Sequence, residues 1–454
     1  MFSKLPAYAE NKVDDFWAVP VPAHWAVAPG LAVCSENKRK NGDLAEAQVL
    51  SLSFGRVVVK PVEKQRGLVP DSYESYQVLD PGDIVVRPTD LQNDQTSIRV
   101  GLVRDRGIIT SAYIGLRTKT PWTTAYAHAY LSTVDSTKRI YGMGSGLRQQ
   151  LGWTDIKRMP CLVPPVEEQA AIVKYLVHAN ARIDKAIAAK RRLIALLQEE
   201  KAAVLAQVIG DVEGNRHRLK HVARIQTGLT LGKDYRQQEL VEFPYLRVAN
   251  VQMGHVDTTD VATVAVPLVE ASRSTLRVGD VLMTEGGDID KLGRGAVWDG
   301  SVQDCLHQNH VFAVRCGDRL APRFLAAWLA VPEARHYFYL TAKKTTNLAS
   351  TNSTTVRELP ITVPSVDVQD RVLDELADQW EPLDLAIERT TEEIDLLREF
   401  RARLVSDVVT GEVDVRGIAA SLPEVDLSET WGYSDSADDL EQADFDDVVE
   451  GSED

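Results

Sequence analysis

Apolar residues follow the pattern of a long amphipathic helix twice along the chain, over residues 160–209 and again over residues 360–409. The two segments align without a gap at an offset of 200 residues. Many aligned positions, Gln169 and Gln369 among them, carry the same residue in both copies. An internal repeat of this length determines how the whole chain is organised, so it is interpreted before any single motif.

Within each copy the apolar positions alternate by four and three over four heptads, which predicts a coiled-coil seam. The seam residues expected to pack together are Leu176, Ile183, Ile187, Ile194, Leu197, Leu376, Leu383, Ile387, Ile394 and Leu397. Polar residues interrupt the seam at the same two places in both copies, at 190/390 and 201/401, and such positions can fix the register. The alternative is two unrelated surface helices on separate cores, but the gapless match includes the seam phase.

Both copies carry start and stop signals for a helix. Pro164 and Pro364 precede the apolar pattern; proline fixes φ and donates no backbone hydrogen bond, which suits a helix start. Gly210 and Gly411 follow its last positions. About 40 residues at 1.5 Å each give a rod of roughly 60 Å. This is nearly two turns of DNA at about 34–36 Å per turn.

Short β-branched runs punctuated by glycine and proline occupy the rest of the chain and predict mostly β globular units. We therefore predict a mixed α/β (α+β) fold in which two globular domains are each followed by a long helix. If the two helices pair antiparallel, they hold the two globular domains at opposite ends, related by a pseudo-two-fold axis. The expected boundaries are globular domain 1 at 1–159, helical region 1 at 160–213, globular domain 2 at 214–358, helical region 2 at 359–416 and an acidic disordered tail at 417–454.

The charge is distributed unevenly along the chain. The formal net charge is −15, but the residues after Arg416 contain 13 Asp and Glu and no Lys or Arg, whereas the first 416 residues contain 53 acidic and 51 basic residues. A near-neutral body is compatible with nucleic-acid binding, which needs a local basic face. The tail has few apolar residues and is expected to be disordered. Solvation is its simplest role, and a DNA-mimicking or regulatory role is the alternative.

The remaining composition predicts a cytoplasmic protein. With 44% hydrophobic and 26% charged residues, the chain has an ordinary globular composition, and no apolar run is long enough to cross a bilayer. The first 16 residues lack the apolar core of a signal peptide. Four cysteines are too few for a disulfide scaffold.

No motif predicts catalysis. The chain has no Walker A loop, so no ATP motor is expected, and it lacks the Asn/Asp-Pro-Pro-Tyr/Phe tetrapeptide of an amino-methyltransferase. Cys305, His307, His310 and Cys316 are a weak candidate for a zinc site, because their spacing does not match the usual ligand pair and residues 311–316 resemble a strand. We predict no catalytic residue and no metal site.

Polar and basic loops between the strands carry the chemistry of base recognition. Arginine can pair bidentately with guanine, and asparagine or glutamine with adenine. The candidate DNA contacts are Lys38, Arg39, Arg87, Gln92, Asn93, Gln95 and Arg148 in the first unit, and Thr230, Lys233, Asn250, Lys291, Arg294, Lys343 and Asn347 in the second. An ordinary solvated loop is the alternative for each segment taken alone.

The chain resembles the specificity subunit of type I restriction-modification systems over roughly residues 14–416. The most specific similarity lies in LVPPVEEQAAIVKYL (162–176) and ITVPSVDVQDRVLDEL (361–376), each of which opens a long helix. Further similarity is found in LSLSFGRV (51–58), PGDIVVRPTDLQNDQTSIRVGLV (81–103), YLRVANVQ (245–252) and HQNHVFAVR (307–315). The second helix departs slightly at Ser365 and Val368, and the acidic tail lies outside the pattern expected of the family.

The resemblance implies that each globular domain is a target recognition domain that reads one half of a bipartite, asymmetric DNA target. It also implies that the two helices form an antiparallel coiled coil with pseudo-two-fold symmetry, which sets the gap between the halves. The implied partners are double-stranded DNA, two methyltransferase subunits and restriction/translocase subunits, with no membrane. This subunit would be non-catalytic and bind no cofactor, whereas S-adenosylmethionine, ATP and Mg²⁺ would belong to the partner subunits. Its expected location is the cytoplasm, in association with the nucleoid.

Two alternatives come from other functional classes. One is a coiled-coil scaffold or adaptor protein without direct DNA readout, and the other is a stand-alone enzyme of DNA modification. Two dissimilar globular units on matching helices favour two tethered DNA readers over both alternatives.

Overall fold

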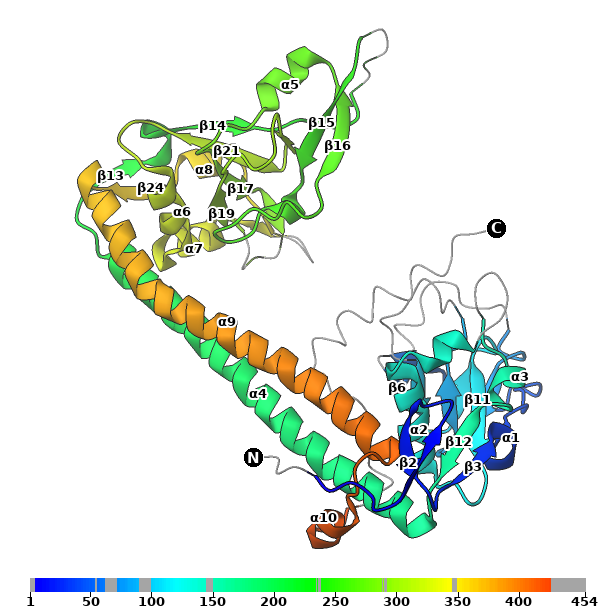
Figure 1. Cartoon of the computed structure of the whole chain (residues 1–454). Coiled ribbons are helices and arrows are strands. Elements are labelled where there is room, and N and C mark those ends of the chain that lie inside the picture. The colour runs from blue at the N-terminus through cyan, green and yellow to red at the C-terminus, as the bar shows by residue number, and fades with distance from the viewer. Residues whose placement is uncertain are drawn as a thin grey trace. The chain divides into compact units, whose positions relative to one another are not determined.

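The computed structural model describes residues 5–53, 55–61, 72–89, 99–143, 150–233, 235, 238–287, 289, 292–344 and 349–425. The chain forms two compact units. Unit 1 comprises Met1–Lys190 and Glu392–Asp454, and unit 2 comprises Arg191–Thr391. Each unit contains a β-rich globule and a segment of both long helices (Figure 1).

The two copies of the apolar repeat form helices α4 (Val166–Gly210) and α9 (Val366–Thr410), each of 45 residues. A short strand precedes each helix, β12 (Pro160–Val163) before α4 and β24 (Pro360–Val363) before α9. The helix α9 continues through Pro382, whose ring removes one bond of the helical ladder. The observed starts agree with the proline signals in the sequence, whereas the internal proline was not part of the prediction.

In unit 1 the segments of α4 and α9 lie side by side and run in opposite directions (Figure 1). Asp184 pairs with Arg401 at 2.8 Å, and Lys190, further along α4, pairs with Glu393, further back along α9. Partners that advance along one helix and retreat along the other define an antiparallel pair. The predicted antiparallel coiled coil is therefore confirmed.

In unit 2 a second pair has the same register. Lys201 pairs with Asp384, and its ammonium lies 4.4 Å from the centroid of the Trp380 ring. The Trp380 indole donates a hydrogen bond to the Lys201 carbonyl at 3.0 Å. Lys201 and Arg401 occupy the same repeat position, as do Asp384 and Asp184. Each cation of one copy thus meets a carboxylate of the other, as a pseudo-two-fold relation between the copies requires.

The predicted seam residues are withdrawn from solvent to different degrees. Those that are buried are Leu176, Ile183, Ile187, Leu376 and Ile394. Those that are partly buried are Ile194, Leu197, Leu383, Ile387 and Leu397.

The globule of unit 1 is built on a six-stranded sheet of order β4-β11-β8-β9-β6-β5. Its strands are β4 (Cys34–Glu36), β5 (Leu50–Ser53), β6 (Arg56–Val59), β8 (Ile84–Val86), β9 (Val100–Leu102) and β11 (Ile114–Thr118). Two-stranded pairs are formed by β1 (Asn11–Asp14) with β2 (Val19–Pro22), by β7 (Gln77–Leu79) with β10 (Gly107–Ile109), and by β3 (Ala26–Pro29) with β12. The helices are α1 (Gly30–Val33), α2 (Thr124–Ser136), η2 (Arg139–Gly142), α3 (Trp153–Ile156) and α10 (Arg416–Ser421).

The globule of unit 2 contains a four-stranded sheet of order β14-β21-β17-β19 and two three-stranded sheets, β16-β15-β20 and β18-β23-β22. The four strands are β14 (Ala223–Thr227), β17 (Val281–Thr284), β19 (Gly295–Val297) and β21 (Val311–Cys316). The others are β15 (Val241–Leu246), β16 (Ala262–Val266), β18 (Gly286–Gly287), β20 (Leu306–His307), β22 (Lys343–Lys344), β23 (Ala349–Ser350), and β13 (Asn215–Arg218), which pairs with β24. The helices are η3 (Leu219–His221), η4 (Val248–Asn250), α5 (Leu268–Ser274), α6 (Pro322–Ala330), α7 (Pro332–Thr341) and α8 (Ser353–Arg357).

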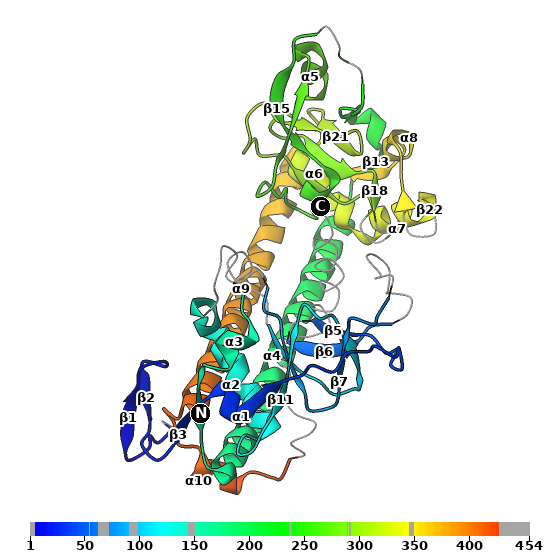
Figure 2. The same ribbon diagram turned by 90° about the vertical axis from the view of Figure 1, so that its right-hand side faces the viewer.

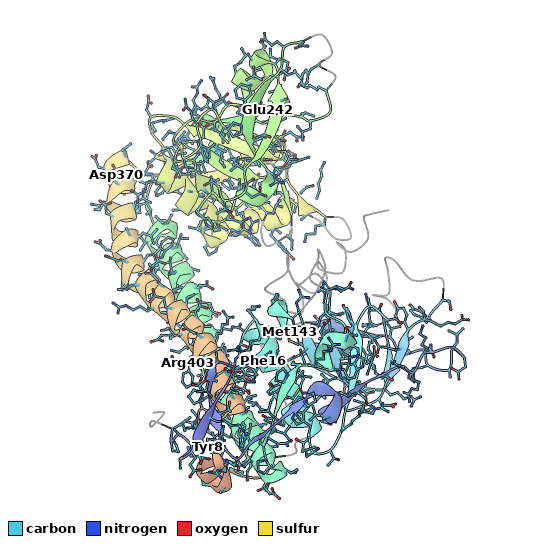
Figure 3. The ribbon with its side chains drawn as sticks, turned by 45° about the vertical axis from the view of Figure 1, so that its right-hand side comes forward. Tyr8, Phe16, Met143, Glu242, Asp370 and Arg403 are labelled. Carbon is cyan, nitrogen blue, oxygen red and sulfur yellow. The ribbon has the colours of Figure 1, made fainter. Side chains whose placement is uncertain are left out.

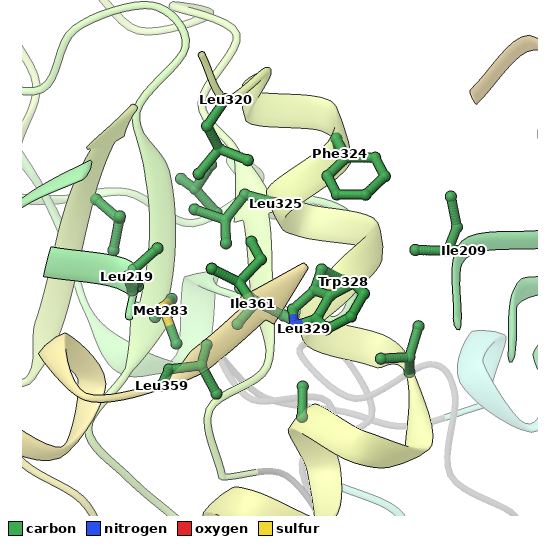
Figure 4. Close-up of a cluster of buried hydrophobic side chains, with 14 of the residues drawn as sticks. Ile209, Leu219, Met283, Leu320, Phe324, Leu325, Trp328, Leu329, Leu359 and Ile361 are labelled. Carbon is green, nitrogen blue, oxygen red and sulfur yellow. The ribbon is translucent and has the colours of Figure 1, made fainter. Parts of the chain in front are cut away.

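The apolar core of unit 2 includes residues of the globule and of both long helices. Phe324 and Trp328 on α6 belong to the same buried cluster as Ile361 on β24 and Ile209 on α4 (Figure 4). Leu376 on α9 belongs to it as well. The helix segments of this unit are therefore part of its core.

A fully buried glutamine fastens the start of each long helix to its globule. The Gln169 side-chain oxygen accepts from Thr123 N at 2.8 Å, and its amide donates to the carbonyls of Pro121 and Pro164 at 3.0 and 2.9 Å. Gln369 repeats this arrangement in unit 2 with Ala321 N, Arg319 O and Pro364 O, at 2.8, 2.8 and 3.0 Å. The residue repeated in the sequence therefore repeats its contacts.

In unit 1 the Glu168 carboxylate also accepts hydrogen bonds from four side chains. The donors to Glu168, which is 7% exposed, are Tyr8 Oη at 3.2 Å, His24 Nε2 at 2.7 Å, Trp25 Nε1 at 2.9 Å and an Arg416 guanidinium nitrogen at 3.2 Å. Figure 3 labels Tyr8, whose ring lies 4.9 Å from the Arg416 guanidinium carbon at the start of α10. Val368 occupies the equivalent position of the second copy, so the second copy has no carboxylate there and this set of hydrogen bonds belongs to unit 1.

Candidate nucleic-acid interface

In unit 1 the described flanks of two polar loops meet at one end of the central sheet. Arg87 directly follows β8, and its N–H donates to the Arg99 carbonyl at 2.8 Å. Leu151 N donates to the Pro88 carbonyl at 3.0 Å. The residues that flank 90–98 and those that follow 144–149 are therefore held together beside the end of β8.

The same connections recur in unit 2. Thr284 ends β17, and its N–H donates to the Arg294 carbonyl at 3.4 Å. Thr351 N donates to the Glu285 carbonyl at 2.7 Å. The strand β23 pairs with β18 on one side and with β22 on the other, and Figure 2 shows β18 and β22 close to α7. Lys343, on β22, thus lies at the same end of the globule as Arg294.

In each globule an arginine pairs with a buried aspartate beside a strand of the sheet. Asp83 is 2% exposed and accepts two hydrogen bonds from Arg117, both at 2.8 Å. Asp280 is 1% exposed and accepts two from Arg315, both at 2.7 Å, which raises the pKa of Arg315. Bidentate pairs of this kind fix geometry as well as charge. Because Asp83 precedes β8 and Asp280 precedes β17, the two globules share a core arrangement despite their unlike loops.

The predicted contacts Lys38 and Arg39 lie away from Arg87. Arg39 donates to Asp80 at 2.9 Å, and this hydrogen bond lowers the pKa of the Asp80 carboxyl. Asp80 precedes β8, whereas Arg87 follows it. The Lys38 ammonium lies 3.5 Å from Glu36, and its side chain is 80% exposed. The structure does not bring these two cations together with Arg87.

Thr230 and Lys233, in the segment after β14, are both exposed. The Lys233 ammonium pairs with Glu270 at 3.1 Å. The structure therefore leaves Thr230 available at the surface but already gives Lys233 a carboxylate partner.

Asn250 occupies a structural position that its sequence context does not reveal. It is 4% exposed, and its amide donates to the carbonyls of Asp257 and Asp260, both at 2.9 Å. Its side-chain oxygen accepts from Arg247 N at 2.8 Å. Because both amide hydrogens serve the backbone, this geometry argues against the DNA contact predicted at Asn250.

Six predicted contacts lie outside the described residues. They are Gln92, Asn93, Gln95, Arg148, Lys291 and Asn347. Among the described candidates, Arg87, Arg294 and Lys343 lie at the sheet ends where the polar loops begin. Arg294 is partly buried, and its Nε has no hydrogen-bond partner in the part of the chain that the structure describes.

Sequence analysis did not single out Tyr339 and Leu340 at the end of α7. They are 51% and 67% exposed, and they precede the exposed Lys343. The sequence alone does not reveal this, because only the structure shows that Ala334 and Phe338 form the buried stripe of α7. The next two residues must then fall outside that stripe.

The weak zinc candidate does not form a site. The His307 Nδ1 lies 2.7 Å from the Val311 carbonyl, and the His310 Nδ1 lies 2.6 Å from a Glu285 oxygen. Cys305 is buried, which raises its pKa to about 11. Among the described residues, no group of three or more His, Cys, Asp and Glu is placed to hold a metal ion.

Comparison with known proteins gives partial matches in sequence and a broad match in fold. The chain is 21% identical over 188 residues to the putative type I restriction enzyme MjaX specificity subunit of Methanocaldococcus jannaschii, covering 41% of this chain and 43% of the relative. It is 22% identical over 224 residues to the EcoKI specificity subunit of Escherichia coli K12, covering 46% and 48%. These matches thus span about half the length of the curated relatives. No protein-family model matches the chain.

A solved chain from a study of the assembly and conformational transition of a type I R-M system matches the fold. The TM-score is 0.56 at 15% identity, and the match covers 87% of this chain and 99% of the solved one. Fold and site together define a protein with two β-rich heads, each fused to one arm of an antiparallel helix pair. The chain is similar in sequence to specificity subunits of type I restriction enzymes over part of its length. No described helix combines the length and the apolarity that crossing a membrane requires.

Proposed function

We propose that this chain is the DNA sequence-specificity subunit of a type I restriction-modification complex. One observation supports this more than any other. The two globules have matching arginine pairs to buried aspartates and matching glutamine contacts to the helices, yet the loops at their equivalent sheet ends differ in sequence. Two domains with the same core arrangement but different loops are suited to recognising two different half-sites.

In this proposal residues 1–159 and 214–358 are the two target recognition domains, and 160–213 and 359–416 are the helical regions that space them. Contacts to phosphates position each domain, and contacts to base edges specify the sequence. A wrong base pair in either half-site should cost about 1–3 kcal/mol. Because the two readers are linked, the second binds at high effective concentration once the first is bound.

The partners and chemistry follow from the same proposal. Two methyltransferase subunits and the restriction subunits dock on this chain at the nucleoid, and they supply the sites for S-adenosylmethionine, ATP and Mg²⁺. This chain then contributes recognition and no catalysis. The acidic residues after Arg416 lie outside this assignment.

Co-expression with its methyltransferase subunits tests the proposal directly. Mapping of methylated adenines across the host genome, with the gene present and deleted, should reveal one bipartite motif with a fixed gap that depends on this chain. Inserting one or two base pairs into the gap should abolish specific binding in a gel shift.

Two results would redirect the assignment. Binding to methyltransferase subunits without any effect on DNA sequence preference would indicate an adaptor. Methyl transfer by the purified chain alone would indicate an enzyme.

A further inference from the structure

The end of α7 in unit 2 presents an apolar and aromatic pair next to two lysines. Tyr339 and Leu340 are 51% and 67% exposed, and Lys343 and Lys344 follow on β22, both exposed. The buried Phe338 of the same helix anchors this end of α7 to the core. An exposed apolar pair on a helix that is anchored to the core can serve as a contact surface when charged groups beside it fit the same partner.

The cations of this surface differ from several others in unit 2. Those others pair with carboxylates, as in Arg216–Glu333, Lys220–Glu358, Lys233–Glu270, Arg247–Asp260 and Arg315–Asp280. Lys343 and Lys344 form no such pair among the described residues, and the Lys344 ammonium lies 4.0 Å from the centroid of the Tyr339 ring. The surface therefore offers positive charge and a ring face together, and this suits a polyanion with stacking bases.

The surface also lies beside the loops assigned to DNA. The strand β22 that carries both lysines pairs with β23, and β23 pairs with β18. Thr351, directly after β23, donates to the Glu285 carbonyl between β17 and β18. The backbone thus holds Tyr339 and Leu340 close to the end of the sheet where Arg294 lies.

The ring at the corresponding sequence position of unit 1 is less exposed. At an offset of 198 residues the matching aromatic is Tyr141, which is partly buried. Its hydroxyl accepts from Arg99 Nε at 3.2 Å, and Lys138 lies 4.9 Å from its ring centroid. The Tyr141 ring thus has contacts within the globule of unit 1, whereas the Tyr339 ring of unit 2 is half exposed to solvent.

We propose that Tyr339 and Leu340 form a wedge that packs against bases at an opened step of duplex DNA, with Lys343 and Lys344 on the adjacent phosphates. The proposal rests on the function proposed above and specifies how unit 2 deforms its half-site. Apolar side chains inserted at a base step kink and partly unstack the duplex, and aromatic side chains stack on exposed base faces. Deformation at this step would bend or loosen the DNA between the two readers and so assist extrusion of an adenine by the methyltransferase.

The test uses the full chain reconstituted with its methyltransferase subunits and a set of target duplexes. Each duplex carries 2-aminopurine at one position of the unit 2 half-site, excluding the methylated adenine, whose own extrusion would give a signal. The wild-type complex should raise the fluorescence at one step. Tyr339→Ser and Leu340→Ser should abolish that rise and weaken target binding by about 5- to 100-fold, and Leu340→Met should retain both.

Leu268 and Val269 on α5 supply a matched control. They are 64% and 66% exposed in the same unit, so Leu268→Ser and Val269→Ser remove a similar apolar pair. These variants should leave fluorescence and affinity unchanged. Thermal unfolding of all variants should coincide with that of the wild type, because each changed side chain is largely exposed.

The outcomes separate this proposal from the broader one. If the wild-type complex binds no specific duplex, the proposed function is wrong. If it binds its target but no position brightens, or if the Ser variants at 339 and 340 behave as wild type, the wedge is wrong and recognition stands. If those variants lose methyltransferase subunits rather than DNA, the surface is a protein interface and the wedge is likewise wrong.

Discussion

Arg401 and Asp184 belong to different helices, 217 residues apart in sequence, and their side chains meet at 2.8 Å. The Arg401 side chain is 5% exposed and the Asp184 side chain 31%. The related pair in unit 2 is more open, with Lys201 at 22% and Asp384 at 56%. One repeat position thus has two different degrees of burial.

The first prediction follows from this difference in burial. Arg401→Ala should lower the free energy of unfolding by about 2–4 kcal/mol, because it leaves a partly desolvated carboxylate. Lys201→Ala should cost about 1 kcal/mol or less, as exposed pairs do. Urea denaturation of both variants, with the double-mutant cycle to Asp184→Ala, measures the difference. Equal losses at the two positions would contradict the assigned burial.

The second prediction concerns the length of the helix pair. Seven residues inserted after Lys190 in α4, together with seven after Thr391 in α9, should keep the seam in phase and preserve the polar pair of each unit. The helices lengthen by about 10 Å, so the gap in the DNA target should grow by about 3 base pairs at 3.4 Å each.

Adenine-methylation mapping in cells that carry the double insertion reads the new gap. The control is an insertion in α4 alone, which misaligns Lys201 with Asp384 or Asp184 with Arg401 and should reduce methylation at every site. An unchanged gap in the double insertion would rule out the helix pair as the spacer.

The third prediction is a loss of stability in mild acid. Burial lowers the pKa of His307 from 6.5 to about 4, and a backbone carbonyl can only accept, so Nδ1 carries the proton toward Val311. Nε2 is buried without a partner among the described residues. Between the two pKa values the unfolded chain binds more protons, so stability is complete above about pH 6.5 and falls as the pH drops toward 4.

The size of this effect is testable by substitution. The contribution of His307 should fall by about 2 kcal/mol between pH 7 and pH 5. His307→Asn keeps a donor for the Val311 carbonyl but does not titrate, so it should flatten the pH profile of urea denaturation. His128, whose burial also lowers its pKa to about 4, should keep part of the acid sensitivity in that variant. A variant profile that parallels the wild type would show that His307 does not couple to folding.

The fourth prediction separates structural from reading residues. Asn250→Ala leaves the carbonyls of Asp257 and Asp260 without their donor and should cost about 1–3 kcal/mol of stability. The methylated motif should stay the same. Lys343→Ala, at an exposed position, should leave stability unchanged and weaken DNA binding with a smaller salt dependence. A changed motif in the Asn250 variant would restore that residue to the interface.

The helices could be predicted from the sequence because their signal is local and repeated. The seam and the proline starts follow from spacing along one segment, whereas the antiparallel pairing was implied only by the family resemblance. Gln169 and Gln369 were visible as a repeat, but their role was not, because their partners are backbone atoms of unlike residues. Pro121 and Arg319 accept these hydrogen bonds through backbone carbonyls, which every residue has. Their side chains therefore give no sequence signal of the contact.

The likeness between the two globules was harder to predict because it appears in their structures and not in the gapless alignment of the helices. The pairs Asp83–Arg117 and Asp280–Arg315 repeat at offsets of 197 and 198 residues rather than 200, so they fall out of the helix alignment. Composition also could not distinguish Asn250, which holds a turn, from an amide free to contact bases. The exposure of Tyr339 and Leu340 could be predicted only once it was known which face of α7 is buried.

The glutamine joints have a mechanical consequence. Each side chain clamps the first turn of its rod to the preceding strand and to the globule by three backbone bonds, in a site closed to water. These hydrogen bonds oppose rotation of a globule about its own helix. In the proposed function, a duplex whose half-sites are out of phase would therefore have to twist to fit, and the torsional stiffness of DNA would become part of the selectivity.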